Sequence, residues 1–222
     1  MKAMILAAGR GERMRPMTDT LPKPLIEVRG KPLIAWHLER IAAAGFRDIV
    51  INVSHLGGLI VEALGDGARW GLAISWSEEA QPLETAGGIA YARAKLGADP
   101  FLLVNADVYC EYPFGQLANI DLAGGLGHIV MVPNPAFRPQ GDFSLVQGKV
   151  GNLPAPRYTY SGLGVLDPRI VVGVAAGTKA PLAPLFRTAA ENAQLGGEVY
   201  KGLWNDVGTP ERLAELNRTN AP

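Results

Sequence analysis

The most constraining feature of this sequence is a regular alternation of short apolar runs with segments of helical periodicity. The apolar runs lack the polar alternation of a half-exposed strand and occupy residues 4–8, 48–54, 72–79, 100–107 and 127–133. Segments with helical spacing lie between them, at residues 32–45, 59–67 and 85–97. Strands that are apolar on both sides are typical of a parallel sheet with helices packed on both faces. The sequence therefore predicts a doubly wound, mostly parallel α/β core.

The last third of the chain is less regular. Its pattern predicts a β-hairpin, a strand and two helices, at residues 142–153, 158–167, 181–197 and 209–219. Thr209 would cap the final helix, with Pro210 in its first turn. Because no repeat or long linker divides the chain, we expect one domain over residues 1–222, in which the hairpin forms a small lobe.

Composition and charge exclude several classes of protein. With 48% hydrophobic residues the chain can bury one sizeable core, and its 21 basic and 21 acidic residues cancel. A balanced charge gives no general attraction to nucleic acid or to an anionic membrane surface, so we expect neither as a partner. No run is long enough for a membrane span. The single cysteine, Cys110, cannot form an internal disulfide, which favours a cytoplasmic location and an inert thiol.

The loop after the first strand has the composition of an anion site. In open sheets of this kind, ligands bind at the carboxyl ends of the strands. Gly9 and Gly11 let the backbone approach a ligand, but Met14 replaces the third glycine of a dinucleotide fingerprint. Arg13 and Lys23 lie close by, and the prolines on both sides of Lys23 restrict its backbone. The loop therefore favours binding of a polyphosphate over a merely solvated basic turn.

Five motifs give the chain a recognisable family pattern. They are "LAAGRGERMRPMTDTLPKPL" at 6–25, "PLETAGG" at 82–88, "VNADV" at 104–108, "YSGLGV" at 160–165 and "WNDVGTPERL" at 204–213. Together they resemble the signature of the sugar-1-phosphate nucleotidylyltransferases, in the family's order and across nearly the whole chain. The resemblance implies a Rossmann-like core, with a nucleotide-binding half over residues 1–110 and a sugar-binding half over residues 111–222.

The resemblance also implies the catalytic residues. In the family's reaction an oxygen of the sugar phosphate attacks the α-phosphorus of a nucleoside triphosphate, and pyrophosphate leaves. Such a nucleophile needs no general base, so the protein aligns the reactants and neutralises their charge. The residues implied are Arg13 and Lys23, for the phosphates, with Asp107 and Asp206 as ligands of Mg²⁺. Taken singly, each aspartate would more often be a cap or a turn residue.

The nucleotide site implied by the resemblance follows the first loop and the second motif. It comprises Leu6, Ala7, Ala8, Gly9, Gly11, Glu12, Arg13, Lys23, Glu79 and Gly87. Glu79 stands where the family commonly has a glutamine that reads the base. A carboxylate accepts from the N3–H of uracil or thymine and disfavours cytosine, whose N3 is an acceptor. Two alternatives stay open: Glu79 belongs to an acidic surface turn, or Gln81 reads the base.

The sugar side departs from the family pattern. A Glu-Lys-Pro segment, whose lysine binds the sugar phosphate in many members, is missing, so Lys149, Arg157 or Lys23 would have to replace it. Glu84 stands where a glycine is usual. The positions that face the sugar in the family are here Asn105, Gly141, Asp142 and Tyr160.

These features together favour one reaction. The resemblance implies uridylyl transfer from UTP to a sugar 1-phosphate, with N-acetylmuramate 1-phosphate as the favoured acceptor, and hence a role in peptidoglycan recycling. Two alternatives remain: a glucose-1-phosphate thymidylyl- or uridylyltransferase, and a regulatory subunit that binds sugar nucleotides without catalysis. We expect a monomer or a small homo-oligomer.

Overall fold

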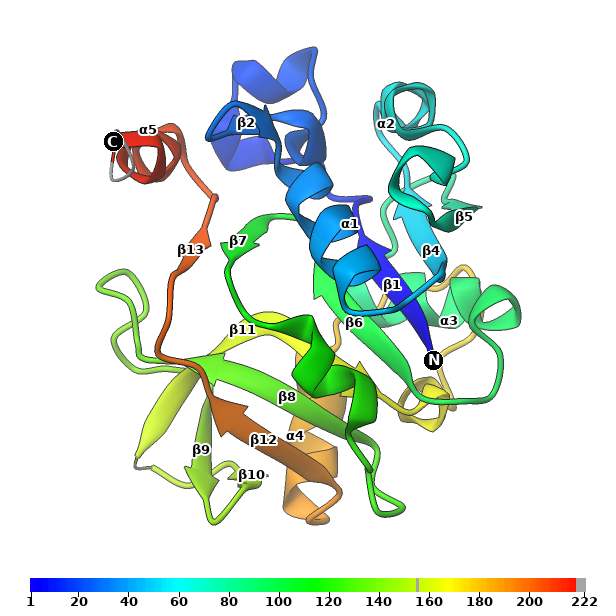
Figure 1. Cartoon of the computed structure of the whole chain (residues 1–222). Helices are drawn as coiled ribbons and strands as arrows, with labels where there is room; N and C mark the ends of the chain where they lie inside the picture. Colours follow the sequence, from blue (N-terminus) through cyan, green and yellow to red (C-terminus); the bar gives the residue numbers. More distant parts are fainter. Residues whose placement is uncertain (155, 219–222) are drawn as a thin grey trace.

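A computed structural model describes residues 1–154 and 156–218 of the chain (Figure 1). Four strands of the first half lie side by side in a nine-stranded sheet and are parallel to one another, in the order β5-β4-β1-β6. Their bounds are β1 Lys2–Leu6, β4 Asp48–Val53, β5 Ala73–Glu78 and β6 Phe101–Asn105. These are the apolar runs of the sequence, and the predicted parallel core is confirmed.

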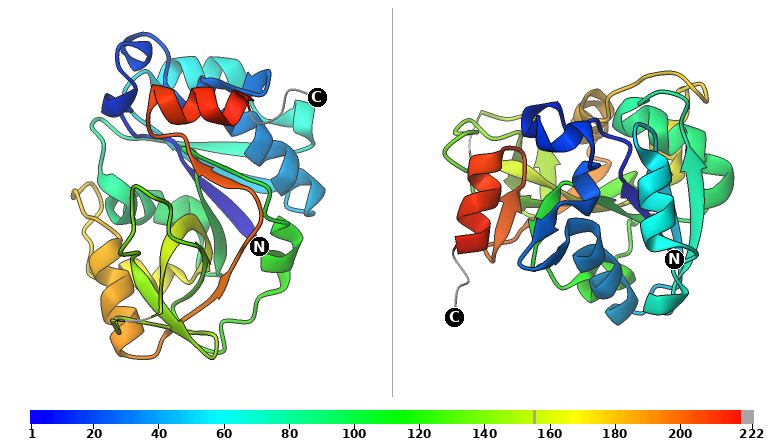
Figure 2. Two further views of the ribbon diagram at one scale, coloured as in Figure 1. Left: turned by 90° about the vertical axis from the view of Figure 1, so that its left-hand side faces the viewer. Right: turned by 90° about the horizontal axis from the view of Figure 1, so that it is seen from above.

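Helices cover both faces of this parallel region, as the lack of polar alternation predicts. Alternate strand residues enter different cores: Ile5 and Ile51 lie in one, Met4 and Val50 in the other. The first core is completed by α1 (Leu33–Ala43) and α2 (Gly57–Leu64), the second by α3 (Glu84–Leu96) and α4 (Ala183–Glu191). Figure 2 shows the two layers from the side.

The second half continues the sheet with mixed strand directions. β11 (Arg157–Leu166) is antiparallel to β6 and to β8 (Gly127–Val132), and β9 (Phe143–Val146) forms the predicted hairpin with β10 (Lys149–Gly151). Only β10 and β11 run against the other seven strands of this sheet.

One predicted element is wrong in extent. The helix predicted over residues 181–197 ends at Glu191, and residues Leu195–Val199 form β12, parallel to β8. A side chain at Gly197 would place its Cβ 2.7 Å from Val150 and 2.9 Å from the carbonyl oxygen of Ile129. A glycine is therefore needed at this position inside the strand, where neighbouring chain segments approach closely.

Two small sheets and the last helix bring the end of the chain onto the opening loop. The elements are β2 (Glu27–Val28) with β3 (Lys31–Pro32), β7 (Val108–Cys110) with β13 (Trp204–Asp206), and α5 (Pro210–Arg218). Met14, Val207 and Leu213 share a third buried cluster, and α5 lies beside β2 (Figures 1 and 2). The predicted cap is present, because the Thr209 hydroxyl accepts from the Arg212 N–H at 3.4 Å.

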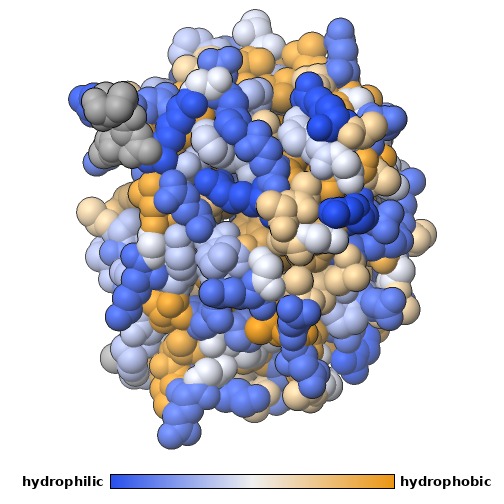
Figure 3. Space-filling view, in the orientation of Figure 1, coloured by the Kyte–Doolittle hydropathy of each residue, from blue (hydrophilic) through white to orange (hydrophobic). Residues whose placement is uncertain are grey.

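Short 3-10 turns connect the larger elements. They span Glu12–Met14, Met17–Asp19, Lys23–Leu25, Ala68–Trp70, Phe114–Asn119 and Pro168–Val171. In the described part of the chain, no helix is long and apolar enough to cross a membrane. Hydrophilic and hydrophobic residues are interspersed on the face that Figure 3 shows. Cys110 is buried, and burial raises the pKa of its thiol to about 11, so the thiol is inert at neutral pH.

Candidate active site

A cavity of about 830 Å³ opens at the carboxyl ends of the parallel strands. Its lining combines the opening loop, the ends of β4, β5 and β6, and the start of α3. Most of the predicted nucleotide and catalytic residues meet here, together with Asn105, which is predicted to face the sugar: Leu6, Ala7, Ala8, Gly9, Gly11, Glu12, Arg13, Lys23, Glu79 and Asp107. The fold thus places the first strand-to-helix loop at the ligand edge of the sheet.

The two glycines of the opening loop are needed for different reasons. Gly11 has φ +65°, a left-handed conformation, and a Cβ there would lie 2.9 Å from the Thr18 methyl group. Gly9 has no protein atom within 4 Å of where its Cβ would be, although it lines the cavity. A side chain at Gly9 would therefore fill space in which a ligand can approach the backbone, whereas Gly11 shapes the turn itself.

Lys23 forms an ion pair with Asp107 inside the cavity. Lys23 Nζ donates to Asp107 Oδ2 over 2.9 Å, and the lysine side chain is 9% exposed while that of the aspartate is 43% exposed. Pro22 adopts an extended conformation and Pro24 follows within the 3-10 turn, so the backbone around the lysine is restricted as predicted. A lysine has three N–H donors, and this contact uses one of them.

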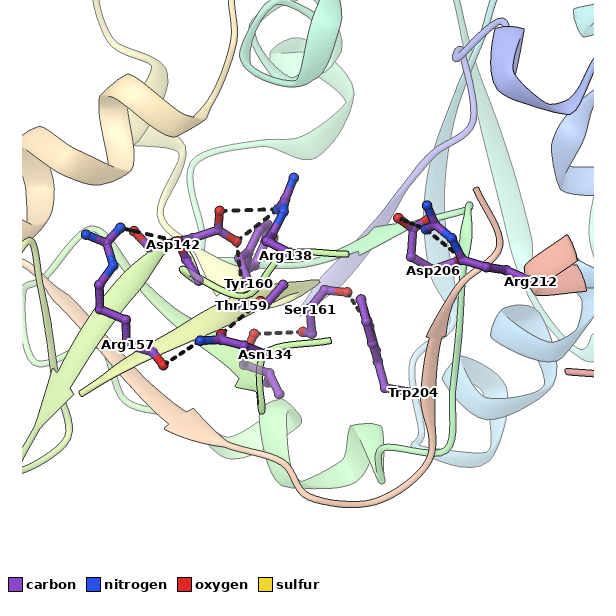
Figure 4. Close-up of polar contacts among 12 residues, drawn as sticks. Asn134, Arg138, Asp142, Arg157, Thr159, Tyr160, Ser161, Trp204, Asp206 and Arg212 are labelled. Carbon is purple, nitrogen blue, oxygen red and sulfur yellow. Dashed lines mark hydrogen bonds and ion pairs between the residues drawn. The ribbon is translucent and has the colours of Figure 1, made fainter. Parts of the chain in front are cut away.

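Asp206 lies next to Asp107 because β7 and β13 pair. Asp206 is opposite Val108 in the ladder, and the Val207 N–H donates to the carbonyl oxygen of Asp107 over 3.1 Å. Arg212 holds one carboxylate oxygen of Asp206, with Nη1 at 2.8 Å from Oδ2 (Figure 4). The other, Oδ1, is buried and has no hydrogen-bond partner among the described residues.

Gly208 lies between this carboxylate and Arg13 of the opening loop. A Cβ at Gly208 would lie 2.7 Å from Asp206 Oδ1, 3.0 Å from Arg212 Nη1 and 3.1 Å from Arg13 Nη2. Arg13 and Asp206, which are far apart in the sequence, therefore converge on one glycine. The sequence analysis did not assign a role to Gly208 or Arg212, although both stand in the motif at 204–213.

The donor set fits magnesium. Hard carboxylate oxygens suit Mg²⁺, and the unpaired Oδ1 of Asp206 is a buried acceptor that a cation would satisfy. No group of three His, Cys, Asp or Glu side chains in the described chain could hold a metal ion by itself. Mg²⁺ commonly uses one or two carboxylates and completes its shell with water and substrate phosphates, as a pair of aspartates would require.

A buried polar network lies at the end of the cavity lined by Ala7, Asn52 and Glu79. Asn52 Oδ1 accepts from the Ala7 N–H at 2.8 Å, and Asn52 Nδ2 donates to Glu79 Oε1 at 2.7 Å. The second oxygen of Glu79 accepts from the Leu83 N–H at 2.9 Å. Glu79 is only 5% exposed, so it does not belong to an acidic surface turn. Gln81 also lines the cavity and stays an alternative reader of the base.

The sequence analysis missed Asn52. The residue stands in the apolar run at 48–54, and at the sequence level its only signal was a polar side chain near the end of a buried strand. The N–H of Ala7 is already bonded to Asn52, so carbonyls of a bound base would need other donors.

The structure explains Gly87 by close packing and shows Glu84 in an ion pair at the cavity rim. A Cβ at Gly87 would lie 2.3 Å from the Thr178 carbonyl oxygen, and the Gly87 N–H donates to Ala180. Packing thus explains this glycine, and its contact with nucleotide stays a prediction. Glu84 has φ +60°, which is why a glycine is usual there, and it pairs with Lys179 over 3.5 Å at the cavity rim.

The predicted sugar residues divide between the cavity and a neighbouring polar cluster. Asn105 lines the cavity, and its buried Oδ1 has no partner among the described residues. Asp142 accepts from the Tyr160 backbone N–H at 2.9 Å and pairs with Arg138 at 3.0 Å (Figure 4). Gly141 joins this cluster through Arg157, whose Nη2 donates to the carbonyl oxygens of both Gly141 and Asp142.

Tyr160 is held within the fold on the α4 side of this cluster. Its ring packs edge-on against Phe186 at a centroid distance of 5.3 Å. Burial raises the pKa of the Tyr160 hydroxyl, so the group stays protonated. Gly141, Asp142 and Tyr160 are not among the residues that line the main cavity, and their sugar contacts stay predictions.

The possible substitutes for the missing lysine lie in different places. Lys149 lines a separate, smaller cavity together with His128 and Gln194. Arg157 is committed to backbone carbonyls. Trp204 anchors the strand that carries Asp206, because its indole N–H donates to the Ser161 carbonyl oxygen at 2.9 Å (Figure 4).

Comparison with known proteins identifies the family. A family model described as "Nucleotidyl transferase" matches residues 2–135. An N-acetylmuramate alpha-1-phosphate uridylyltransferase of Neisseria meningitidis is 49% identical, over 97% of this chain and 96% of the relative. A mannose-1-phosphate guanyltransferase of Schizosaccharomyces pombe is 37% identical over 95% of this chain, which spans 62% of that relative.

A solved structure shows the same fold. The structure of a Bacillus anthracis protein described as a glucose-1-phosphate thymidylyltransferase, in complex with sucrose, matches with a TM-score of 0.87. The match covers 99% of this chain and 94% of the other at 18% identity. The doubly wound fold expected from the sequence is therefore confirmed.

Proposed function

Because the chain belongs to the nucleotidyl transferase family, we propose that it transfers a uridylyl group from UTP to N-acetylmuramate 1-phosphate. The products would be UDP-N-acetylmuramate and pyrophosphate. The observation that carries this choice is the 49% identity to an N-acetylmuramate alpha-1-phosphate uridylyltransferase over nearly the full length of both chains. The cavity geometry supports it, because the cationic, carboxylate and base-reading residues line one space or its edge.

The residues of the cavity suit attack of one phosphate on another. Two anions must approach, so fixed positive charge at the reacting groups lowers the barrier. Lys23 is placed to bind the α-phosphate and the incoming sugar phosphate, since it lines the cavity and donates only one hydrogen bond to Asp107. Arg13, whose guanidinium reaches toward Gly208, would hold the departing pyrophosphate with N–H groups of the loop. No general base is needed, because the attacking oxygen is already ionised.

Asp107 and Asp206 are the residues that would hold Mg²⁺. When bound, the ion would neutralise charge on the phosphates and orient them for in-line attack. The β7–β13 pairing holds the backbones of the two residues near one another, and Arg212 holds Asp206 Oδ2 while Oδ1 has no partner among the described residues. Lys23 keeps Asp107 in place and balances its charge.

The two halves of the chain would divide the substrates between them. We assign the nucleotide to residues 1–110 and the sugar to residues 111–222, with Asn105 at the boundary. The unpaired Oδ1 of Asn105 supports a contact with a sugar hydroxyl or amide N–H. A cytoplasmic enzyme of peptidoglycan recycling fits a buried free thiol and a nucleoside triphosphate donor. A monomer or small homo-oligomer stays our expectation, to be checked by light scattering.

Pyrophosphate release tests the donor and the acceptor together. The purified protein would be incubated with Mg²⁺, each of UTP, dTTP, CTP and GTP, and each of N-acetylmuramate, N-acetylglucosamine, glucose and mannose 1-phosphates. We expect the highest kcat/KM for UTP with N-acetylmuramate 1-phosphate, and loss of activity with a chelator. Preference for glucose 1-phosphate would support the thymidylyl- or uridylyltransferase alternative. No release with any pair would support a regulatory subunit.

A further inference from the structure

The polar residue at the end of β4 stands out within an apolar strand. Asn52 is 2% exposed, and in the sheet it is level with Leu6 of β1 and Ser77 of β5. Burying an amide is costly unless its donors and acceptors are bonded. Asn52 meets this condition through partners that belong to the nucleotide site on two different segments, the opening loop and the segment after β5.

The partners of Asn52 fix the direction of its amide. The Ala7 N–H can only donate, so the oxygen of Asn52 must face the loop and the NH₂ group must face Glu79. Glu79 then receives a donor on each oxygen, from Asn52 Nδ2 and from the Leu83 N–H. Both carboxylate oxygens of Glu79 therefore accept a hydrogen bond from the protein, and each has a further lone pair for another donor.

A glycine of α3 keeps room for this contact. A Cβ at Gly88 would lie 2.8 Å from both Asn52 Nδ2 and Glu79 Oε1. The second glycine of the motif at 82–88 therefore faces the Asn52–Glu79 hydrogen bond, whereas Gly87 packs against residues 178–180.

We propose that Asn52 is a positioning residue that sets the selectivity for the donor base, by holding the Glu79 carboxylate at one place relative to the opening loop. This inference rests on the proposed function. Uracil presents an N3–H donor to such a group, while cytosine presents an acceptor and is repelled. Asn52 would act through Glu79 and Ala7, without donating to the phosphates.

An isosteric variant and its compensating partner test the inference. In Asn52→Asp, the carboxylate accepts from the Ala7 N–H but faces Glu79 without a donor. We expect KM for UTP to rise about 10- to 100-fold, the loss expected for a hydrogen bond to a charged group, with kcat within about threefold of wild type. The ratio of kcat/KM for UTP to that for CTP should fall at least about tenfold.

Adding Glu79→Gln to Asn52→Asp restores complementary groups. The amide introduced at position 79 donates to the carboxylate at position 52, and its oxygen accepts from the Leu83 N–H. We expect the double variant to recover most of the UTP selectivity and of the affinity for UTP lost in Asn52→Asp, whereas Glu79→Gln in the wild-type background should not improve on wild type. Thermal unfolding of each variant shows whether the fold is retained, and recovery in the double variant keeps the test valid if Asn52→Asp is less stable.

Ser77→Ala is the matched control. Ser77 is level with Asn52 on the next strand and is equally buried, but its hydroxyl has no partner among the described residues. This variant should keep the wild-type KM and base selectivity. If Asn52→Asp also keeps both while wild type is active, the inference fails and the proposed function stands. An inactive wild-type protein would overturn the proposed function instead.

Discussion

The backbone N–H of Val207 donates to the carbonyl oxygen of Asp107 over 3.1 Å. This bond extends the pairing of β7 with β13 by one residue and joins two motifs that are about 100 residues apart in the sequence. The backbones of Asp107 and Asp206 are consequently held near one another by hydrogen bonds, while Lys23 and Arg212 hold the two side chains. A candidate metal site built this way is preorganised before any ligand binds.

Removing either carboxylate should abolish turnover without unfolding the protein. In Asp107→Asn and Asp206→Asn the side-chain shape is kept and one metal-binding charge is lost. We expect kcat/KM to fall at least about 100-fold in each, with the midpoint for Mg²⁺ activation shifted upward. The exposed Asp99 lies outside the cavity, so Asp99→Asn should match wild type. An unchanged rate in Asp107→Asn would remove this residue from the metal site.

Gly208→Ala should damage the site by crowding. The added methyl group would lie 2.7 Å from Asp206 Oδ1 and would push apart the groups of Arg13, Asp206 and Arg212. We expect kcat to fall about tenfold or more, measured by pyrophosphate release. Gly58→Ala is the control, because a Cβ at Gly58 has no neighbour within 4 Å and alanine is the better helix former. If the two variants have equal activity, crowding at Gly208 is irrelevant.

Lys23→Met should show how much of the activity depends on the charge of Lys23 and how much on the packing of its side chain. Methionine has a similar length, so the buried stem is kept while the ammonium group is lost. We expect kcat/KM to fall about 100-fold or more, because the reacting phosphates lose a fixed cation. Lys149 lies in the smaller cavity, so Lys149→Met should leave the KM for the sugar phosphate unchanged. A large rise in that KM would show that Lys149 replaces the missing lysine of the family.

His37 should make the folded state sensitive to acid. Its ring is buried in α1, its Nε2 is 2.8 Å from the Val108 carbonyl oxygen, and burial lowers its pKa to about 4. The unfolded chain, with a histidine pKa near 6.5, therefore binds the proton more tightly than the folded one. Stability is fully present above pH about 6.5 and should fall by about 3 kcal/mol as the pH drops to about 4.

Denaturant unfolding across this pH range measures the effect. His37→Gln can keep the hydrogen bond to Val108 and removes the titrating group, so it should flatten the slope between pH 4 and about 6.5. The exposed His55 serves as the control, and His55→Gln should retain the wild-type slope. Equal slopes in wild type and His37→Gln would assign the acid sensitivity to other groups.

The parts of the fold that local pattern determines could be predicted from the sequence. The parallel strands, the three helices between them and the cap at Thr209 follow from apolar periodicity and turn chemistry. β12 could not be predicted, because the sequence "LGGEV" is also typical of the end of a helix. Only the close contacts with Val150 and Ile129 explain why glycine is needed there. Tertiary contact here overrode local preference.

The candidate site shows the same division. Lys23 and Asp107 stand in motifs whose order along the chain indicated their roles, and the structure brings them to 2.9 Å. Asn52 carries no motif, and its partner Glu79 is 27 residues away, so their hydrogen bond is visible only once β4 and β5 are aligned. Polar networks of this kind depend on register across strands, which composition and spacing do not reveal.

Met14, Val207 and Leu213 are buried in one cluster, which couples the position of α5 to ligand binding. Arg13 immediately precedes Met14, and Asp206 immediately precedes Val207, so the ligand-facing side of each segment is backed by a residue of the same apolar cluster. By thermodynamic linkage, a nucleotide that orders the loop must also make opening of the last helix less favourable. Detachment of that helix must in turn lower the affinity of the site for phosphate. Amide hydrogen exchange in α5 is therefore a reporter of occupancy at the candidate site, which the helix contacts through Arg212 and Asp206.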